Sequence, residues 1–341
     1  MQPLSTEVHT DAKSFAALRG EWNTLLGKSG TNTLFLTWEW QRTWWEWFGG
    51  ESQLSIVSVR DGSELVGLAP LFFPPMRENQ RTAQLVGGIE VSDYLDLLVV
   101  ADHRETEVYR SIWQALTDDA PHSWHVLDLH NVPASSPTLR TLPGIASASG
   151  EFQITSDIEE VCPVITLPST WDQYLSLLSR KQRHEIRRKL RKANREAEVS
   201  WYYAEDPVSL DHEVDDFISL HRKSGAHKKA FMGEGMQGFF RDVAHAVFDA
   251  EWLRLAFLVV NGAKVASMFC FDFDDSYLVY NSGYDPNTYS SLSTGIVLLA
   301  HCIRDAIDRG RRVFDFLRGE EEYKYRFGGV RTEIHNLRLS R

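Results

Sequence analysis

The sequence has few cysteines and no long apolar run. Its 341 residues contain three cysteines, which lie far apart in apolar surroundings (Cys162, Cys270 and Cys302). An odd number of distant cysteines favours reduced core thiols over a disulfide framework. No stretch reaches the roughly 18 apolar residues of a membrane span, and the N-terminus lacks the basic and apolar regions of a signal peptide. We therefore expect a soluble, cytoplasmic protein without a transmembrane segment.

Motifs for metal-dependent or triad catalysis are missing as well. His184, His221 and His227 do not have the spacing of metal ligands, and no Ser/His/Asp order stands out. We therefore expect no metal and no catalytic triad. Positive charge is also scarce, with 36 Lys and Arg against 47 Asp and Glu. The resulting net charge of −11 argues against a general nucleic-acid binder.

What is present indicates a globular protein of two domains. A hydrophobic fraction of 43% and a charged fraction of 24% are typical of soluble domains. The length favours two domains, which we place at residues 1–160 and 161–341. The expected strands and helices indicate an α/β fold with mixed (α+β) sheets. Asp61-Gly62 and Asn261-Gly262 each predict a tight β-hairpin.

Two segments of the second half carry clusters of positive charge. A single helix is expected from Trp171 through Glu198, with nine Lys and Arg between Arg180 and Arg195 against one acid, Glu185. Pairing within the helix cannot balance this excess, so we weigh an anionic ligand or surface against a merely solvated face. Residues 224–235 contain glycines and lysines and are expected to form a loop that could act as a lid.

A strand–helix–strand unit near the C-terminus organises the chain. Tyr277–Gly283 and Val313–Leu317 have strand composition, and apolar residues from Val297 to Ile307 predict a helix between them. A crossover helix usually joins parallel strands. The helix follows Ser293, Thr294 and Gly295, and its free N–H groups would suit a phosphate. The alternative is that Ser293 or Thr294 only caps the helix.

The chain resembles the CelD/BcsL family of GNAT-like acetyltransferases, which is associated with cellulose and exopolysaccharide biosynthesis. The C-terminal motif G-x-x-x-F-D-F-x-R-G-x-x-x-Y-K carries much of the resemblance. The other matching segments are FLTWEWQRTWWEWFG, SDYLDLLV, SRKQRHEIRRKLRK and YNSGYDPNTYSSLSTG. The resemblance implies two GNAT-like halves, as in the Fem-type aminoacyltransferases, with the C-terminal half better preserved. It also implies acyl transfer from acetyl-CoA or another acyl-CoA to a small-molecule or saccharide acceptor.

The resemblance also assigns a donor site. The pyrophosphate of the donor would lie on the loop formed by Ser291, Leu292, Ser293, Thr294, Gly295 and Ile296. This loop departs from the usual pattern [QR]-x-x-G-x-[GA], because it has one glycine and hydroxyl residues elsewhere. An aminoacyl donor carried by tRNA, as in the Fem-type enzymes, is therefore an alternative. A non-catalytic module that binds an anionic polymer through the basic helix is a third reading.

Residues for chemistry are expected beside this loop. Glu320, or Asp315 through a water molecule, would take the proton of an acceptor amine or hydroxyl. Tyr323 would protonate the leaving thiolate, and backbone N–H groups would hold the oxyanion. The residues expected to bind substrate are Tyr280, Asn281, Tyr284, Arg318, Lys324, Arg183 and Arg187. The alternatives are that Asp315 only pairs with Arg318 and that Tyr323 only packs. The acceptor and the oligomeric state are not readable from the sequence.

Overall fold

The computed structural model describes residues 3–118 and 123–341. The chain divides into two compact units. Unit 1 comprises residues 1–160 and 333–341, and unit 2 comprises residues 161–332. Residues 333–341, which the sequence analysis assigned to the C-terminal domain, belong to unit 1, because the last strand, β13 (Val330–Ser340), pairs there with β6 (Val126–Pro133).

Unit 1 is built on a mixed sheet with the strand order β1-β2-β3-β4-β6-β13. The β4–β6 pair is parallel and the other neighbours are antiparallel. Its remaining strands are β1 (Ser5–His9), β2 (Gln53–Asp61), β3 (Glu64–Phe73), β4 (Thr82–Leu85) and β5 (Leu98–Val99), which pairs with β3. Its helices are α1 (Lys13–Leu26), α2 (Trp38–Phe48), α3 (Glu105–Thr117) and α4 (Pro137–Ser147), and η1 (Leu34–Leu36) is a short 3-10 turn.

A charged cluster lies on the sheet of unit 1. The imidazole of His130 lies 3.2 Å from a carboxylate oxygen of Asp128 and 2.5 Å from one of Glu159. Burial disfavours the charged imidazole, but the hydrogen bonds and charges of the two carboxylates outweigh it and raise the pKa of His130 to about 9. Arg338 of β13 also contacts Asp128, at 3.2 Å. The cluster therefore links β6 to β13, through Arg338, and to the segment that carries Glu159.

The strands of unit 2 form a mixed sheet segment with the order β7-β12-β11-β10-β9-β8. The β11–β12 pair is parallel, as the crossover helix predicts, and the other neighbours are antiparallel. The strands are β7 (Gln153–Thr166), β8 (Val199–Tyr203), β9 (Leu253–Val260), β10 (Ala263–Phe273), β11 (Ser276–Tyr284) and β12 (Val313–Asp315). The hairpin predicted at Asn261-Gly262 is confirmed, and both residues have the positive φ of a type I′ turn (49° and 81°).

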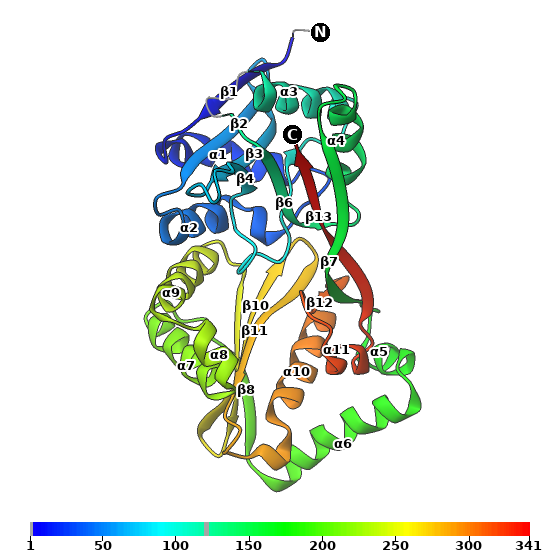
Figure 1. The fold of residues 1–341 in the computed structure, drawn as a ribbon. Helices are drawn as coiled ribbons and strands as arrows, with labels where there is room; N and C mark the ends of the chain where they lie inside the picture. Colours follow the sequence, from blue (N-terminus) through cyan, green and yellow to red (C-terminus); the bar gives the residue numbers. More distant parts are fainter. Residues whose placement is uncertain (1–2, 119–122) are drawn as a thin grey trace. The chain divides into compact units, whose positions relative to one another are not determined.

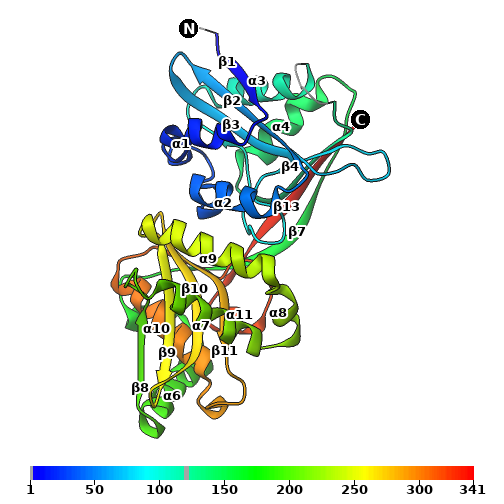
Figure 2. The same cartoon turned by 90° about the vertical axis from the view of Figure 1, so that its left-hand side faces the viewer.

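Helices cover both faces of the sheet of unit 2. They are α5 (Trp171–Leu177), α6 (Arg180–Glu196), α7 (Leu210–Lys223), α8 (Ala226–Phe231), α9 (Glu234–Asp249), α10 (Thr294–Asp308) and α11 (Glu322–Arg326), with a 3-10 turn η2 (Ser290–Leu292) before α10. Helices α7 to α9 lie on one side of β10 and β11, and α10 lies on the other (Figure 1). Figure 2 looks onto the face that α7 and α9 cover.

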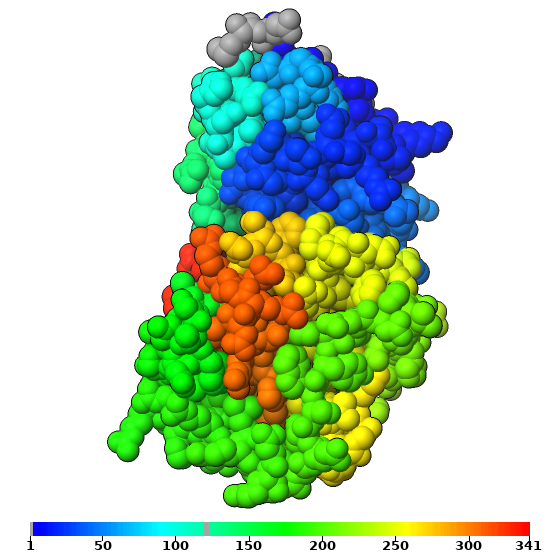
Figure 3. Space-filling view, turned by 180° about the vertical axis from the view of Figure 1, so that it is seen from behind, coloured from blue at the N-terminus to red at the C-terminus, as the bar shows by residue number. Residues whose placement is uncertain are grey.

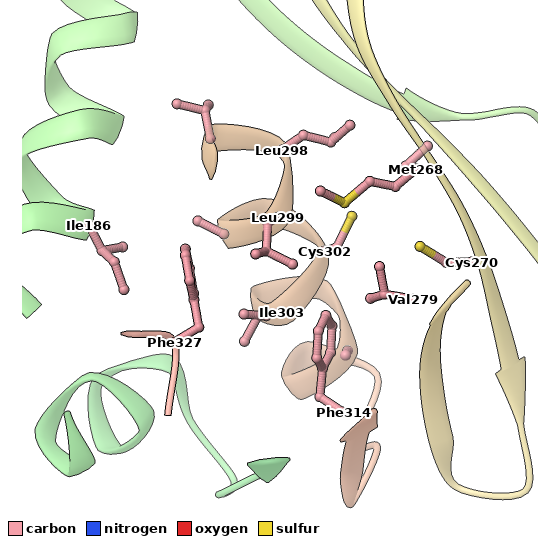
Figure 4. Close-up of a cluster of buried hydrophobic side chains, with 14 of the residues drawn as sticks. Ile186, Met268, Cys270, Val279, Leu298, Leu299, Cys302, Ile303, Phe314 and Phe327 are labelled. Atoms are coloured by element: carbon pink, nitrogen blue, oxygen red, sulfur yellow. The ribbon is translucent and has the colours of Figure 1, made fainter. Parts of the chain in front are cut away.

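Alternate residues of β10 explain this two-sided arrangement. Phe269 packs on Phe217 of α7, with ring centroids 5.2 Å apart. Met268 and Cys270 point the other way, into a buried cluster with Leu298 and other residues of α10 (Figure 4). Successive side chains of a strand alternate between the two faces, so one strand supplies both cores. Ile186 of α6 and Phe327 extend the α10 cluster outward.

Two expectations for unit 2 need correction. The helix expected to be continuous from Trp171 is broken between α5 and α6, where Leu178 is extended (φ −77°, ψ 152°). Ser179 starts α6 with a complete capping box to Gln182, a local signal that the run of lysines and arginines obscured. The loop expected over residues 224–235 contains the helix α8 and the first residues of α9.

Residues 3–118 and 123–341 contain neither a candidate membrane-spanning helix nor a candidate metal cluster. None of the helices there combines the length and the hydropathy that a membrane span requires. No group of three or more His, Cys, Asp or Glu side chains in those residues is arranged to hold a metal ion.

Candidate active site in unit 2

The two parallel strands of unit 2 separate along their length. The ladder joins Ser276–Leu278 of β11 to Val313–Asp315 of β12. Strand β11 then continues to Tyr284, whereas β12 ends at Asp315. The carboxyl end of β11 is therefore open on the side that faced β12. An open strand edge offers backbone N–H and C=O groups to a ligand.

A β-bulge sits where the strands begin to separate. Phe269 of β10 pairs with Asn281, but the next residue, Cys270, pairs with Val279. Tyr280 is thus the extra residue on β11. A bulge twists its strand and changes the direction of the backbone groups beyond it. The bulge places Tyr280 on the α9 side, where its ring stacks on Phe240 at 5.7 Å.

The N-terminus of α10 faces the same opening. Ser293 precedes the helix in the left-handed conformation (φ 57°), and no side chain of the described residues caps the helix there. The capping role that we weighed for Ser293 and Thr294 is therefore not adopted. Gly295 follows in the first turn, and a Cβ added to it would meet no atom within 4 Å. The first N–H groups of α10 therefore have no side-chain cap, and Thr294, Gly295 and Ile296 line a pocket.

A pocket of about 600 Å³ joins these features. This volume lies in the range of small-molecule and cofactor sites. Its lining includes residues from β10, β11, the loop before α10, the start of α10 and the segment that opens α11. The expected site residues that line it are Tyr284, Ser293, Thr294, Gly295, Ile296 and Tyr323.

Tyr323 is one of the residues that line the pocket. Its ring packs edge-on against Phe316 at 6.2 Å. In the part of the chain that the structure describes, its hydroxyl has no hydrogen-bond partner. Burial, helped by the negative charge of Glu321, raises the pKa of the Tyr323 phenol well above its usual value of 10. The phenol therefore stays protonated at neutral pH.

The carboxylates are placed differently from expectation. Glu320 is not among the pocket-lining residues, and its side chain contacts the Tyr325 hydroxyl and Arg331, each at 3.3 Å. Asp315 is buried, and its carboxylate accepts the Leu317 N–H at 2.7 Å. The carboxylate that does line the pocket belongs to Glu321, the residue after Glu320.

Lys324 and Arg318 also lie outside the pocket lining. Lys324 is buried, and its ammonium donates to the carbonyl oxygens of Leu317, Arg318 and Gly319 at 2.6–3.2 Å. It also lies 2.9 Å from Glu321. The ammonium thus holds the turn after β12 in place. The sequence could not distinguish this structural role of Lys324 from substrate binding, because both roles place a cation near the end of the strand.

The other expected ligand residues are engaged elsewhere. The loop residues Ser291 and Leu292 do not face the pocket: the carbonyl of Ser291 accepts from Lys192 at 2.8 Å, and Leu292 is buried in the core. Asn281 makes a hydrogen bond with His221 at 3.2 Å. On the basic helix, Arg183 reaches the carbonyl of Leu175 and Arg187 lies 3.6 Å from Asp172.

The helix α6 nevertheless borders the loop before α10. Lys192 links it to the loop before α10, and α6 packs beside α10 (Figure 3, green beside orange). Several of its cations have acidic partners within the helix, such as Arg188 with Glu185 at 2.7 Å. Arg180, Lys181 and Arg191 have none among the residues that the structure describes. They therefore leave positive charge on this surface.

Two residues near the opening were missed in the sequence. Lys228 of α8 lines the pocket, and its ammonium donates to the carbonyl oxygen of Ser282 on β11. His221 is buried, and burial together with the positive charge of Lys228 lowers its pKa to about 4. A neutral His221 packs so closely on β11 that a Cβ at Gly283 would lie 2.3 Å from its backbone nitrogen. The only sequence signal was a cluster of His and Lys in the expected lid.

The fold is similar to that of several solved structures. The chain is similar to FemX over 98% of its own length and 96% of that chain, with a TM-score of 0.67 and 9% identity. L-PGS from Bacillus licheniformis matches over 94% and 91%, with a TM-score of 0.55 and 12% identity. A tandem GNAT protein from the clavulanic acid biosynthesis pathway matches over 98% of each chain, with a TM-score of 0.51 and 13% identity.

These likenesses confirm the expected fold class, a mixed α/β structure with two GNAT-like halves. Comparison of the sequence with curated proteins found no match. Comparison with family models found a match in the second half of the chain. Residues 180–325, from the start of α6 into α11, match the model of the acetyltransferase (GNAT) domain family.

Proposed function

We propose that unit 2 transfers an acyl group from acetyl-CoA, or another acyl-CoA, to an amine or hydroxyl of a sugar- or cell-envelope-related acceptor, as in enzymes of the CelD/BcsL type. One observation carries the proposal. The opening between β11 and β12, the uncapped N-terminus of α10 and the protonated phenol of Tyr323 meet in a single pocket. The family match over residues 180–325 supports the same reaction class.

The residues of the pocket fit an acyl-CoA donor. The N–H groups of Thr294, Gly295 and Ile296 at the start of α10 would hold its phosphates, because an uncapped helix N-terminus favours negative charge. Gly295 leaves open space at that point, so the backbone is accessible. When bound, the thioester supplies an activated acyl group for direct transfer.

Side chains and backbone of unit 2 would then handle the charges of the reaction. Backbone N–H groups at the open end of β11 would stabilise the negative charge on the acyl oxygen. Tyr323 would give its proton to the leaving sulfur. Glu321 lines the pocket and would take the proton of the acceptor, in place of the neighbouring Glu320. Asp315 would act by shaping the turn rather than by accepting the proton through a water molecule.

A second candidate function is a Fem-like transfer of an amino acid from charged tRNA. It is favoured by the surface of α6, where Arg180, Lys181 and Arg191 carry charge without acidic partners in the described residues. Phosphate backbones bind such surfaces in a salt-dependent way. The same surface supports the third reading, a non-catalytic module for an anionic polymer.

Calorimetric titration separates the three readings. The acyl-CoA proposal requires that acetyl-CoA binds the wild-type protein and that this binding survives neutralisation of Arg180, Lys181 and Arg191. Absence of acetyl-CoA binding, together with binding of aminoacyl-tRNA that this triple variant loses, would replace it with the Fem-like reading. Salt-sensitive binding of an anionic polymer such as heparin, without binding of either donor, would leave only the polymer-binding module.

A further inference from the structure

Lys228 reaches the reaction opening from an unexpected direction. It belongs to α8, which packs with α7 on the face of the sheet opposite α10 (Figure 1). Its ammonium crosses to β11 and donates to the carbonyl oxygen of Ser282 at 2.5 Å, with the Ser282 hydroxyl 3.4 Å away. Ser282 lies beyond the last residue of β11 that pairs with β12. The lysine therefore contacts the strand where the opening has formed.

This ammonium has no direct ion pair in the described residues, although the negative charge of Glu321 acts on it from farther away. In the part of the chain that the structure describes, no carboxylate lies within 4 Å of it. Glu321 lines the same pocket but is already paired with Lys324 at 2.9 Å. An ammonium has three N–H donors, and its two contacts are both with Ser282. A half-buried cation of this kind gains from an anion that enters the pocket.

The position of Lys228 indicates which substrate would bring that anion. The N-terminus of α10, where the donor phosphates are proposed to bind, lies on the face of the sheet that carries Met268 and Val279. Lys228 comes from the face that α7 and α9 cover. The two positive features thus approach the opening from opposite faces, and an acceptor must enter across from the donor to attack its acyl group.

We infer that Lys228 binds a negatively charged group of the acceptor, a carboxylate or a phosphate, and so selects anionic acceptors. This inference rests on the proposed function, because it takes the α10 side for the donor. Burial lowers the pKa of Lys228, and an anion at this place would favour its charged form. Lys228 is therefore a specificity-determining residue of the acceptor side.

The test uses pairs of small acceptors that differ in one charged group. Suitable probes are glucosamine 6-phosphate with glucosamine, and glycine with glycinamide. Binding to the full-length protein is followed by ligand-observed NMR without donor, and transfer from acetyl-CoA by thiol release. Wild type should bind the anionic member of at least one pair on the order of tenfold more tightly, because that member adds a charge-assisted hydrogen bond. Lys228→Met should remove this preference, and Lys228→Arg should restore part of it.

Lys229→Met is the matched control, because Lys229 is adjacent and exposed but does not line this pocket. It should keep the wild-type preference. Acetyl-CoA affinity, measured by calorimetry, should be the same in Lys228→Met and wild type. The inference is overturned if wild type prefers no charged probe, if the preference survives in Lys228→Met, or if this variant loses acetyl-CoA affinity tenfold. A wild-type protein without acetyl-CoA affinity would refute the proposed function, while the NMR titrations would still decide the role of Lys228.

Discussion

Gly295 provides a direct test of the donor site. It lies in the first turn of α10 and lines the pocket, and a Cβ at this position meets nothing within 4 Å. Tryptophan at this position would extend into the open space without displacing neighbouring atoms at its Cβ. We expect Gly295→Trp to fold and to block the region where the donor phosphates are proposed to lie.

The size of the effect follows from ligand linkage. Acetyl-CoA at 100 times its dissociation constant would stabilise the native protein by about 2.7 kcal/mol. For a cooperative unit in the range of 150–250 residues, this corresponds to a rise in Tm of roughly 5–10 °C. Unit 2, residues 161–332, lies in that range. Differential scanning fluorimetry with and without acetyl-CoA should show this rise for wild type and none for Gly295→Trp.

Gly295→Ala is the matched control. Its methyl group fits the open space, and alanine favours a helix over glycine by up to about 1 kcal/mol. This variant should keep the acetyl-CoA-induced rise in Tm and should not be less stable than wild type without ligand. An undiminished rise in Gly295→Trp would refute the assignment of the phosphate site, provided that its far-UV circular dichroism matches that of wild type.

Three further predictions concern the remaining polar groups. Tyr323→Phe should lower kcat by about 10²- to 10⁴-fold, the usual contribution of a general acid, and leave acetyl-CoA affinity unchanged; a kcat within threefold of wild type would assign Tyr323 to packing alone. Lys324→Met should lower Tm by roughly 5–10 °C, because three carbonyl oxygens lose a buried donor at a cost of about 2–3 kcal/mol; an unchanged Tm with weaker substrate binding would instead support the ligand role first expected for Lys324. His130 has a folded pKa of about 9, above its unfolded value near 6.5, so its stabilisation of unit 1 should be complete below pH 6.5 and fade as pH rises through 9. In chemical denaturation, the free energy of unfolding of wild type should exceed that of His130→Ala by less and less as pH rises over that range. A constant difference would contradict the raised pKa.

Local sequence signals predicted the elements of unit 2 well. The turn residues at Asn261-Gly262 and the apolar periodicity between Val297 and Ile307 act over a few residues, so they are readable without tertiary contacts. The parallel pairing of β11 and β12 followed from the length of the crossover between them. The break between α5 and α6 was local too, but the run of basic residues that follows Ser179 hid its capping signal.

The site could be predicted only in part, because side chains far apart in sequence decide it. The approach of α8 to β11 brings Lys228 to Ser282, across more than fifty residues of chain, and nothing in either segment records that contact. The same holds for the carboxylates. Glu320, Glu321 and Glu322 are adjacent in sequence, and the turn after β12 determines that Glu321 lines the pocket.

That turn gives the residues of the C-terminal motif F-D-F-x-R-G-x-x-x-Y-K different roles, some in shaping the turn and one in lining the pocket. Leu317 has a positive φ of 55°, a conformation that costs a branched residue energy and persists only when its surroundings hold it. Asp315 supplies the acceptor for its N–H, and Lys324 supplies donors for its carbonyl oxygen and the next two. Gly319 is required because its φ is 112° and a Cβ there would lie 2.5 Å from the carboxylate of Glu321. The acid, the glycine and the lysine of the motif thus stop β12 and turn the chain away from β11, which leaves the phenol of Tyr323 facing the opening that this turn creates.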